Sequence, residues 1–316
     1  MKLAVILPYL DALTPGQIEL ARNIKALSNP EVKGIFCGRK TDHLDEFGTE
    51  FFSSMPDIGK GLDGVIFTGL TSIDAEYIWF FGDDYLHPDA LNIVSSYLLA
   101  GQETRPVLLA TQSVPDINQL DTYRSAPPQS GVRKLTGDEA FVRYKDELGY
   151  ISRVIYARHL LKGQDGQLEQ FMGTNWVCLA AIFMSIFPQN SSAEIAVLDE
   201  VTVYGIERDQ HQEHWYNYET FLYHTLEVVQ NLIGKGYSFN LTSVAAVSRN
   251  IIWRALKARA IHKLDGIAHG YANTWNLARL KPLLPQSIFW LAYFGYTLDF
   301  VLKFAARINR WKQRYL

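Results

Sequence analysis

Two adjacent aspartates, Asp83 and Asp84, follow an apolar run in the segment YIWFFGDDYLHPD, which covers residues 77–89. The run has no polar alternation, which is typical of a strand covered on both faces, so both carboxylates are expected where that strand ends. Adjacent carboxylates offer only oxygen ligands, and these suit Mg²⁺ or Mn²⁺ shared with the phosphates of a substrate. The alternative is that one of the two aspartates caps a helix that begins near Pro88.

The residues around this pair predict alternating strands and helices. Thr14, Pro15 and Gln17 mark a helix start, since Thr and Gln can form a capping box and Pro suits the first turn. Strands are expected at Leu3–Leu7, Val32–Cys37, Val65–Thr68, Ala75–Phe81 and Pro106–Ala110, with a loop and a short helix over 41–64. This order predicts an α/β fold with a mostly parallel, doubly wound sheet. Ligands of such sheets bind at the carboxyl ends of the strands.

The rest of the chain is expected to be mainly helical. Residues 137–162 are predicted to form a helix, and residues 200–204 a strand before a further long helix. Within the apolar stretch 170–187 only about 12 residues are densely apolar, which is too short to cross a bilayer and indicates a buried helix. The predicted organisation is an α/β half over 1–112, a second half of the same domain over 113–248, and a helical tail over 249–316.

Charge is distributed unevenly along the chain. The 316 residues carry 30 Lys or Arg and 33 Asp or Glu, a net charge of −3. Residues 249–316 hold 12 of the basic residues and two acids, about +10, which leaves about −13 on the remainder. This asymmetry favours an anionic partner for the tail. No nucleic-acid partner is expected.

The tail also combines Trp and Tyr with Lys and Arg, which is typical of helices that lie in a membrane interface. An anionic membrane surface is therefore the expected partner of residues 249–316. A basic helix packed on the protein's own core and a helix that spans the bilayer are the two alternatives.

The cysteines and the N-terminal residues indicate the compartment. Cys37 and Cys178 are the two cysteines, which excludes a disulfide framework or zinc-ligand spacing and predicts two buried free thiols. The apolar run before Pro8 is short and has no cleavage site, which favours a first strand over a signal peptide. We therefore expect a cytoplasmic protein that associates peripherally with the inner face of the membrane.

The segment YIWFFGDDYLHPDAL resembles the metal-binding segment of family-2-type glycosyltransferases with the GT-A fold. In that family an apolar strand typically ends in an acidic triplet or quartet, followed by a Leu, a Pro-Asp and a helix. Here Gly82 stands in place of the first acid and Tyr85 in place of the last. The resemblance covers residues 1 to about 112.

Three other stretches bear on this resemblance. The opening strand ends in Pro8-Tyr9, which is similar to the Pro-Thr-Tyr of the family. After the second strand the family usually carries an Asp-Asp-Gly-Ser that reads the nucleotide base, whereas this chain reads CGRKTDH. Gly173-Thr174 and residues 207–215 are loosely similar to abequosyltransferase-like members, which add deoxysugars to lipid-linked units.

The resemblance implies a GT-A-like fold and a role for several residues. Asp84 becomes the expected main ligand of Mg²⁺ or Mn²⁺, and Asp83 is expected to contact the ribose or support the metal. Pro8, Tyr9 and Asp11 are expected to line the nucleotide pocket. Arg39 is expected to face the diphosphate, with solvated surface as the alternative for this side chain.

A transfer to a hydroxyl group needs a carboxylate or a histidine that accepts the hydroxyl proton. Asp209 is the first candidate and Glu207 the second, because both lie in a polar loop between a predicted strand and a predicted helix. His211 and His214 are candidate metal ligands at i, i+3 spacing. The alternative for the whole stretch is an exposed charged loop that caps the following helix.

These observations together favour a metal-assisted glycosyltransferase. Such an enzyme would move a hexosyl or deoxyhexosyl group from a nucleotide-diphosphate donor to a hydroxyl on a cell-surface or lipid-linked glycan. The resemblance implies inversion at the sugar carbon. A sugar nucleotidyltransferase is one alternative, although it would need a glycine-rich phosphate loop after the first strand. The other alternative is a non-catalytic scaffold with the same fold.

Overall fold

The computed structural model describes residues 1–9, 11–38, 43–56, 59–100, 104–125, 131–145, 147–174, 176–188, 193–206, 218–264, 284–287, 289–290 and 293. Contacts within the chain divide it into two units, Met1–Arg208 and Asp209–Leu316. Each unit is described by itself.

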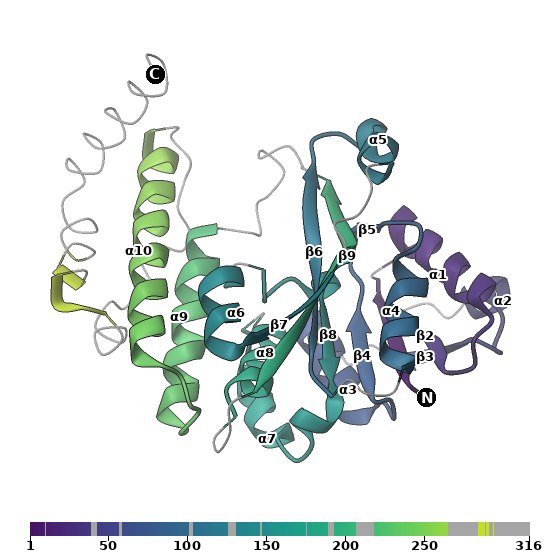
Figure 1. The fold of residues 1–316 in the computed structure, drawn as a ribbon, viewed down its shortest axis with the longest axis horizontal. Helices are drawn as coiled ribbons and strands as arrows, with labels where there is room; N and C mark the ends of the chain where they lie inside the picture. The colour runs from purple at the N-terminus through teal and green to yellow at the C-terminus, as the bar shows by residue number, and fades with distance from the viewer. Residues whose placement is uncertain are drawn as a thin grey trace. The chain divides into compact units, whose positions relative to one another are not determined.

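The first unit has an α/β architecture (Figure 1). Its strands are β1 (Leu3–Pro8), β2 (Val32–Gly38), β3 (Phe52–Pro56), β4 (Tyr77–Phe80), β5 (Tyr85–Leu86), β6 (Val107–Val114), β7 (Val132–Thr136), β8 (Val154–Ala157) and β9 (Glu194–Ile206). Its α-helices are α1 (Pro15–Leu27), α2 (His43–Phe47), α3 (Gly61–Ser72), α4 (Ala90–Leu99), α5 (Leu120–Arg124), α6 (Gly137–Tyr144), α7 (Asp165–Leu168) and α8 (Val177–Ile186). Short 3₁₀ turns are η1 (Ile117–Gln119), η2 (Ile151–Arg153), η3 (Arg158–Leu161) and η4 (Glu169–Phe171).

The strands form one sheet in the order β3-β2-β1-β4-β8-β6-β9-β5, with β7 paired to β9. Strands β3, β2, β1 and β4 are parallel, β8 runs against β4 and β6, and β6 and β9 are again parallel. Strands β5 and β7 run against β9. Most strands therefore share one direction, which confirms the predicted mostly parallel sheet.

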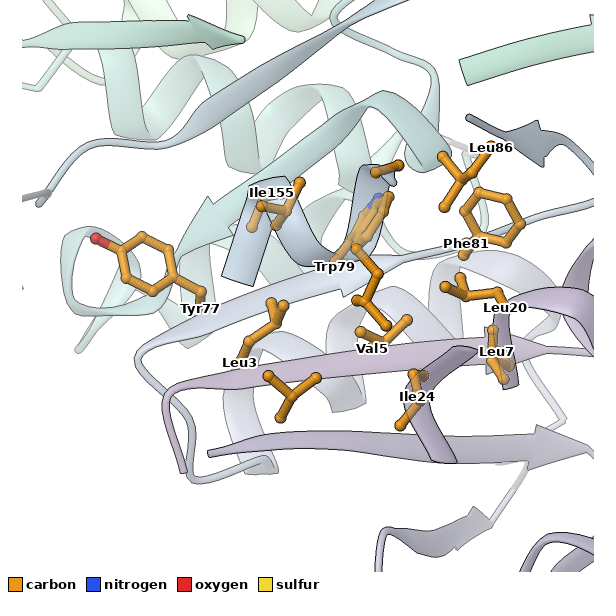
Figure 2. Close-up of a cluster of buried hydrophobic side chains, with 14 of the residues drawn as sticks. Leu3, Val5, Leu7, Leu20, Ile24, Tyr77, Trp79, Phe81, Leu86 and Ile155 are labelled. Atoms are coloured by element: carbon orange, nitrogen blue, oxygen red, sulfur yellow. The ribbon is translucent and has the colours of Figure 1, made fainter. Parts of the chain in front are cut away.

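Strand β1 is buried on both faces, as its continuous apolar sequence predicts. Leu3, Val5 and Leu7 alternate along the strand toward the face that carries α1, where they join Leu20 and Ile24 in one cluster (Figure 2). Full burial of each of these side chains contributes about 2 kcal/mol to the stability of the folded state. The first strand is thereby fixed between β2 and β4 in the sheet.

The opposite face of β1 packs on α3. A Cβ at Gly69 would lie only 2.5 Å from Ile6 Cδ1 and 2.7 Å from the Phe80 ring. Helix α3 can approach the sheet this closely because Gly69 has no side chain. Ile6 of β1 and Phe80 of β4 are paired across the sheet, so one helix covers both strands.

Residues 65–68 form part of α3, so the predicted strand Val65–Thr68 is wrong. Val65, Ile66, Gly69 and Leu70 are buried at helical spacing, and this spacing extends beyond the four residues that read as a strand. Short apolar runs have no period long enough to separate a strand from a buried helix.

The predicted helix over 137–162 is correct only at its start. Helix α6 ends at Tyr144, and the chain then passes through η2 into β8. Strand β8 is a four-residue run that is buried throughout and pairs with both β4 and β6. A run of four apolar residues is too short for its period to distinguish a strand from a segment of a buried helix.

Strand β3 lies inside residues 41–64, which were expected to form a loop and a short helix. Only Phe52 and Met55 of this strand are buried, so its apolar signal is weak. The short helix of the same prediction is present as α2, His43–Phe47.

The second unit contains α9 (Tyr218–Gly234) and α10 (Leu241–Leu264), which pack against each other. Leu226, Val229 and Leu232 are buried on α9, as predicted for the long helix, and Val244 and Ile251 are buried on α10. Among the described residues, none of the helices combines the length and apolarity needed to cross a bilayer.

Candidate functional site

The carboxyl ends of β1, β2 and β4 lie side by side because these strands are parallel neighbours in the sheet. The buried side chain of Gln17 ties two of these ends to α1: its Nε2 donates to the carbonyl oxygens of Pro8 (2.6 Å) and Phe81 (3.1 Å). Gln17 also completes the capping box with Thr14, as the sequence predicted. One glutamine therefore holds the helix start and both strand ends together.

Asp83 and Asp84 lie at this edge, between β4 and β5. Asp83 is exposed and Asp84 is partly buried. Burial raises the pKa of the Asp84 carboxyl above its ordinary value, and this effect outweighs a hydrogen bond from Ser152 and the nearby charge of Arg153, which lower it. The N-cap of α4 is Asp89, so neither aspartate of the pair occupies that capping position.

Ser152 and Arg153 reach this edge from η2, which precedes β8. The Ser152 hydroxyl accepts a hydrogen bond from the backbone N–H of Gly82 (2.9 Å). The Arg153 side chain is 6% exposed, and its Nη1 lies 3.3 Å from Glu147 Oε2. Because β8 runs against β4, the turn that enters β8 meets the end of β4.

Gly16 and Gly205 both lie close to Asp84. A Cβ at Gly16, in the first turn of α1, would lie 1.9 Å from the Asp84 carbonyl oxygen, so α1 touches the backbone of Asp84. A Cβ at Gly205, near the end of β9, would lie 3.6 Å from Asp84 Oδ1. Glycine at position 205 therefore leaves space beside the carboxylate.

Three other predicted site residues, Pro8, Tyr9 and Asp11, lie at or just after the end of β1. The Tyr9 ring is buried against the backbone of Gly38, where a Cβ would lie 2.4 Å from it, and Asp11 is exposed in the bend after β1. Pro8 and Tyr9 thus adjoin the strand that leads to Asp83 and Asp84. Arg39, Glu207, Asp209, His211 and His214 lie outside the described residues.

The donor set at this edge fits a hard divalent cation. Across the described part of the chain, no group of three or more His, Cys, Asp or Glu side chains is arranged to hold a metal ion. Mg²⁺ and Mn²⁺ do not need such a group, because they are commonly held by one or two carboxylates together with water and substrate phosphates. Asp84 and Asp83 are the residues that would supply such carboxylates, and Gly205 leaves space at Asp84 Oδ1.

Sequence reasoning did not find Ser152, Arg153 or Gly205. None of them belongs to a motif, and each lies far along the chain from Asp84. Their proximity depends on strand order, because β8 pairs with β4, and Gly205 follows Tyr204, the residue paired with Tyr85. No local pattern carries that information.

No family model matches the sequence, and no curated protein matches it. Among solved structures, the chain is similar to S. aureus TarS 1–349 in complex with UDP, with 12% identity over 96% of this chain and 89% of that chain and a TM-score of 0.53. It is also similar to the same protein in complex with UDP-GlcNAc, with 11% identity, the same coverage and a TM-score of 0.52. At this identity the likeness concerns the fold, and it confirms the predicted GT-A-like architecture.

Proposed function

We propose that this chain is a glycosyltransferase that moves a sugar from a nucleotide-diphosphate donor to an acceptor hydroxyl. The observation that carries the proposal is the Asp83-Asp84 pair at the carboxyl edge of a GT-A-like sheet, where ligands of such sheets bind. The similar structures hold UDP and UDP-GlcNAc, which supports a uridine diphosphate sugar as the first donor to test. The comparisons give no support to the narrower resemblance to abequosyltransferase-like members.

Each proposed role follows from the chemistry of the side chain. Asp84 binds Mg²⁺ or Mn²⁺ through its carboxylate, and Asp83, which is exposed, supports the metal or contacts the ribose. A divalent cation there neutralises charge that develops on the leaving diphosphate. Pro8, Tyr9, Asp11 and Arg39 are the proposed nucleotide-binding residues.

The general base is proposed from chain position alone. Glu207 and Asp209 follow Gly205, which lies beside Asp84 Oδ1. Either carboxylate would accept the proton of the acceptor hydroxyl, and direct attack of that hydroxyl on the sugar carbon would invert its configuration. The acceptor we propose is a cell-surface or lipid-linked glycan.

The test is a screen of UDP, GDP and dTDP sugars for release of nucleoside diphosphate with Mn²⁺ or Mg²⁺. We expect release from at least one donor, and chelation of the cation by EDTA should reduce it to the rate without enzyme. Release of pyrophosphate instead would favour a sugar nucleotidyltransferase. If calorimetry detects no binding of UDP, GDP or dTDP with Mn²⁺, the result would contradict the proposal and support a non-catalytic scaffold.

We further propose that the C-terminal tail holds the enzyme at the inner, anionic face of a membrane. Trp290 and Tyr293 are 46% and 43% exposed, which suits aromatic side chains that enter a lipid interface. Deleting residues 284–316 is expected to abolish co-sedimentation with vesicles containing phosphatidylserine. Binding of the full chain should weaken as salt rises, because the screening length falls to about 10 Å at 0.1 M.

Two controls accompany the vesicle experiment. Neutral vesicles should bind the full chain weakly at every salt concentration, because they lack the anionic surface. Sedimentation that does not change with salt would contradict an electrostatic interfacial contact. It would favour a spanning helix or aggregation, which a control without vesicles separates.

A further inference from the structure

We propose that Gly205, near the end of β9, determines which groups complete the coordination of the cation at Asp84. Because Gly205 has no side chain, the space beside Asp84 Oδ1 is left to water and to the phosphate oxygens of the donor. The inference rests on the proposed metal role of Asp84. It assigns a part in that site to a residue on another strand that carries no reactive group.

The space beside the Asp84 carboxylate is defined by one distance. A Cβ at position 205 would lie 3.6 Å from Asp84 Oδ1, and among the described residues no other heavy atom beyond its chain neighbours lies within 4 Å of that point. Gly205 and Asp84 are both partly exposed, so water can reach this space. A hard cation such as Mg²⁺, bound by one or two carboxylates, keeps several waters and takes further oxygen atoms from phosphates. These ligands need room next to the carboxylate.

The two usual reasons for a glycine do not apply at position 205. The backbone of Gly205 does not have the positive φ that favours glycine. An added Cβ would make ordinary van der Waals contact with Asp84 Oδ1, whereas at Gly16 it would overlap a backbone oxygen at 1.9 Å. A glycine inside a strand weakens that strand and often marks a place where a ligand comes close. The open space beside Oδ1 is therefore the feature that this glycine provides.

A bulge in β9 brings the glycine to this place. The register between β6 and β9 shifts after Leu109, and residues 199–201 have no partner on β6. Beyond the shift, Ser113 pairs with Gly205. If the first register continued, Ser113 would pair with Thr202 instead. Bulges of this kind re-aim side chains next to functional sites, and here the bulge places a residue without a side chain beside the carboxylate.

The bulge is held by an ion pair and by burial. Arg133 of β7 donates two hydrogen bonds to the Asp199 carboxylate, Nη2 to Oδ1 at 2.6 Å and Nε to Oδ2. Such bidentate pairs are strong and geometrically specific. Val201 is fully buried in the core cluster of the sheet. The end of β9, and Gly205 with it, therefore has a fixed place.

Gly205→Ala fills the space with a methyl group that the fold can accommodate. We expect the Kd for Mn²⁺ in the presence of UDP to rise about tenfold in G205A, within the range typical of changes beside a metal ligand. The midpoint of thermal unfolding in EDTA should not fall, since alanine is the more stable residue inside a strand. The full chain is used, and free Mn²⁺ is measured by its electron paramagnetic resonance signal, so the readout does not depend on turnover.

Gly205→Asp is expected to have the opposite effect on metal binding. It places a carboxylate in the space that water and phosphate would otherwise occupy, and the affinity for a hard cation rises with the number of charged ligands. The Kd for Mn²⁺ without UDP should therefore fall about tenfold in G205D. Gly166→Ala is the control, because a Cβ there would meet no atom within 4 Å, and G166A should bind Mn²⁺ like the unsubstituted protein.

Three outcomes overturn the inference, and they can be told apart. If D84N loses Mn²⁺ binding but G205A binds like the unsubstituted protein, Gly205 does not control the coordination at Asp84, and the proposed function stands. If G205A and G205D both weaken Mn²⁺ binding, position 205 matters for packing and offers no place for a ligand. If the unsubstituted protein binds Mn²⁺ no better than D84N, the proposed metal role fails, and the inference fails with it.

Discussion

Replacing Asp84 with asparagine is expected to lower the metal-dependent release of nucleoside diphosphate by about 10²–10³-fold. The estimate follows from the several kcal/mol of charge stabilisation that a catalytic metal supplies, at 1.36 kcal/mol for each factor of ten in rate. Asparagine keeps the shape of the side chain and removes the charge that attracts the cation. The measurement is the initial rate at saturating Mn²⁺, with the donor found in the screen.

This loss is not expected to come from unfolding. Burial raises the pKa of Asp84, so the metal-free fold favours the neutral form of this side chain relative to water. Burying a charged carboxylate costs free energy of folding at neutral pH, and the neutral amide of asparagine avoids this cost. The midpoint of thermal unfolding of D84N in EDTA should therefore equal or exceed that of the unsubstituted protein.

Two substitutions of the same type provide the comparison. Asp89→Asn alters an exposed aspartate in the same segment, whose side chain makes no capping hydrogen bond to α4, and its rate is expected to stay within about twofold. Asp83→Asn should have an intermediate effect if Asp83 supports the metal. Full metal-dependent activity in D84N would contradict the role proposed for Asp84.

Elements that depend on neighbouring residues were predicted from the sequence, whereas elements that depend on pairing with distant strands were missed. Strands β1 and β4 were predicted correctly because their residues are apolar on both faces, which is a local property of the sequence. The position of Asp84 at the edge of the sheet could be predicted for the same reason, since Asp84 lies four residues after the end of β4. Strand β8 was missed because its burial depends on pairing with β4 and β6.

The same reasoning explains which parts of the site remained hidden. Ser152 meets Asp84 only because β8 is inserted between β4 and β6. Gly16 could be placed in a helix from Thr14 and Gln17, yet nothing in the local pattern indicates that it touches the Asp84 backbone. The sequence thus predicted the residue that carries the charge, whereas its supporting contacts required the three-dimensional arrangement.

Replacing Gly16 with alanine is expected to destabilise the first unit by about 3 kcal/mol, at the upper end of the cost of overpacking a core. The new Cβ would lie 1.9 Å from the Asp84 carbonyl oxygen, and a backbone atom cannot rotate away. For a unit of this size, such a loss lowers the midpoint of thermal unfolding by roughly 6–12 °C.

Gly166→Ala is the matched control for this substitution. Gly166 occupies the same second position of its helix, α7, and a Cβ there would meet no atom within 4 Å. G166A is therefore expected to be neutral or to stabilise by up to about 1 kcal/mol, because alanine reduces the freedom of the unfolded chain. Equal unfolding midpoints for G16A and G166A would contradict the close contact at Gly16.

G16A should also weaken Mn²⁺ binding, although Gly16 has no side chain that could contact a metal. Helix α1 is held by the Thr14 cap and by the hydrogen bonds of Gln17 to Pro8 and Phe81, so the Asp84 backbone is the part expected to move. D84N should lower metal affinity without lowering stability, whereas G16A should lower both. Comparing the two variants separates the chemical role of the Asp84 carboxylate from the packing that places it at the edge of the sheet.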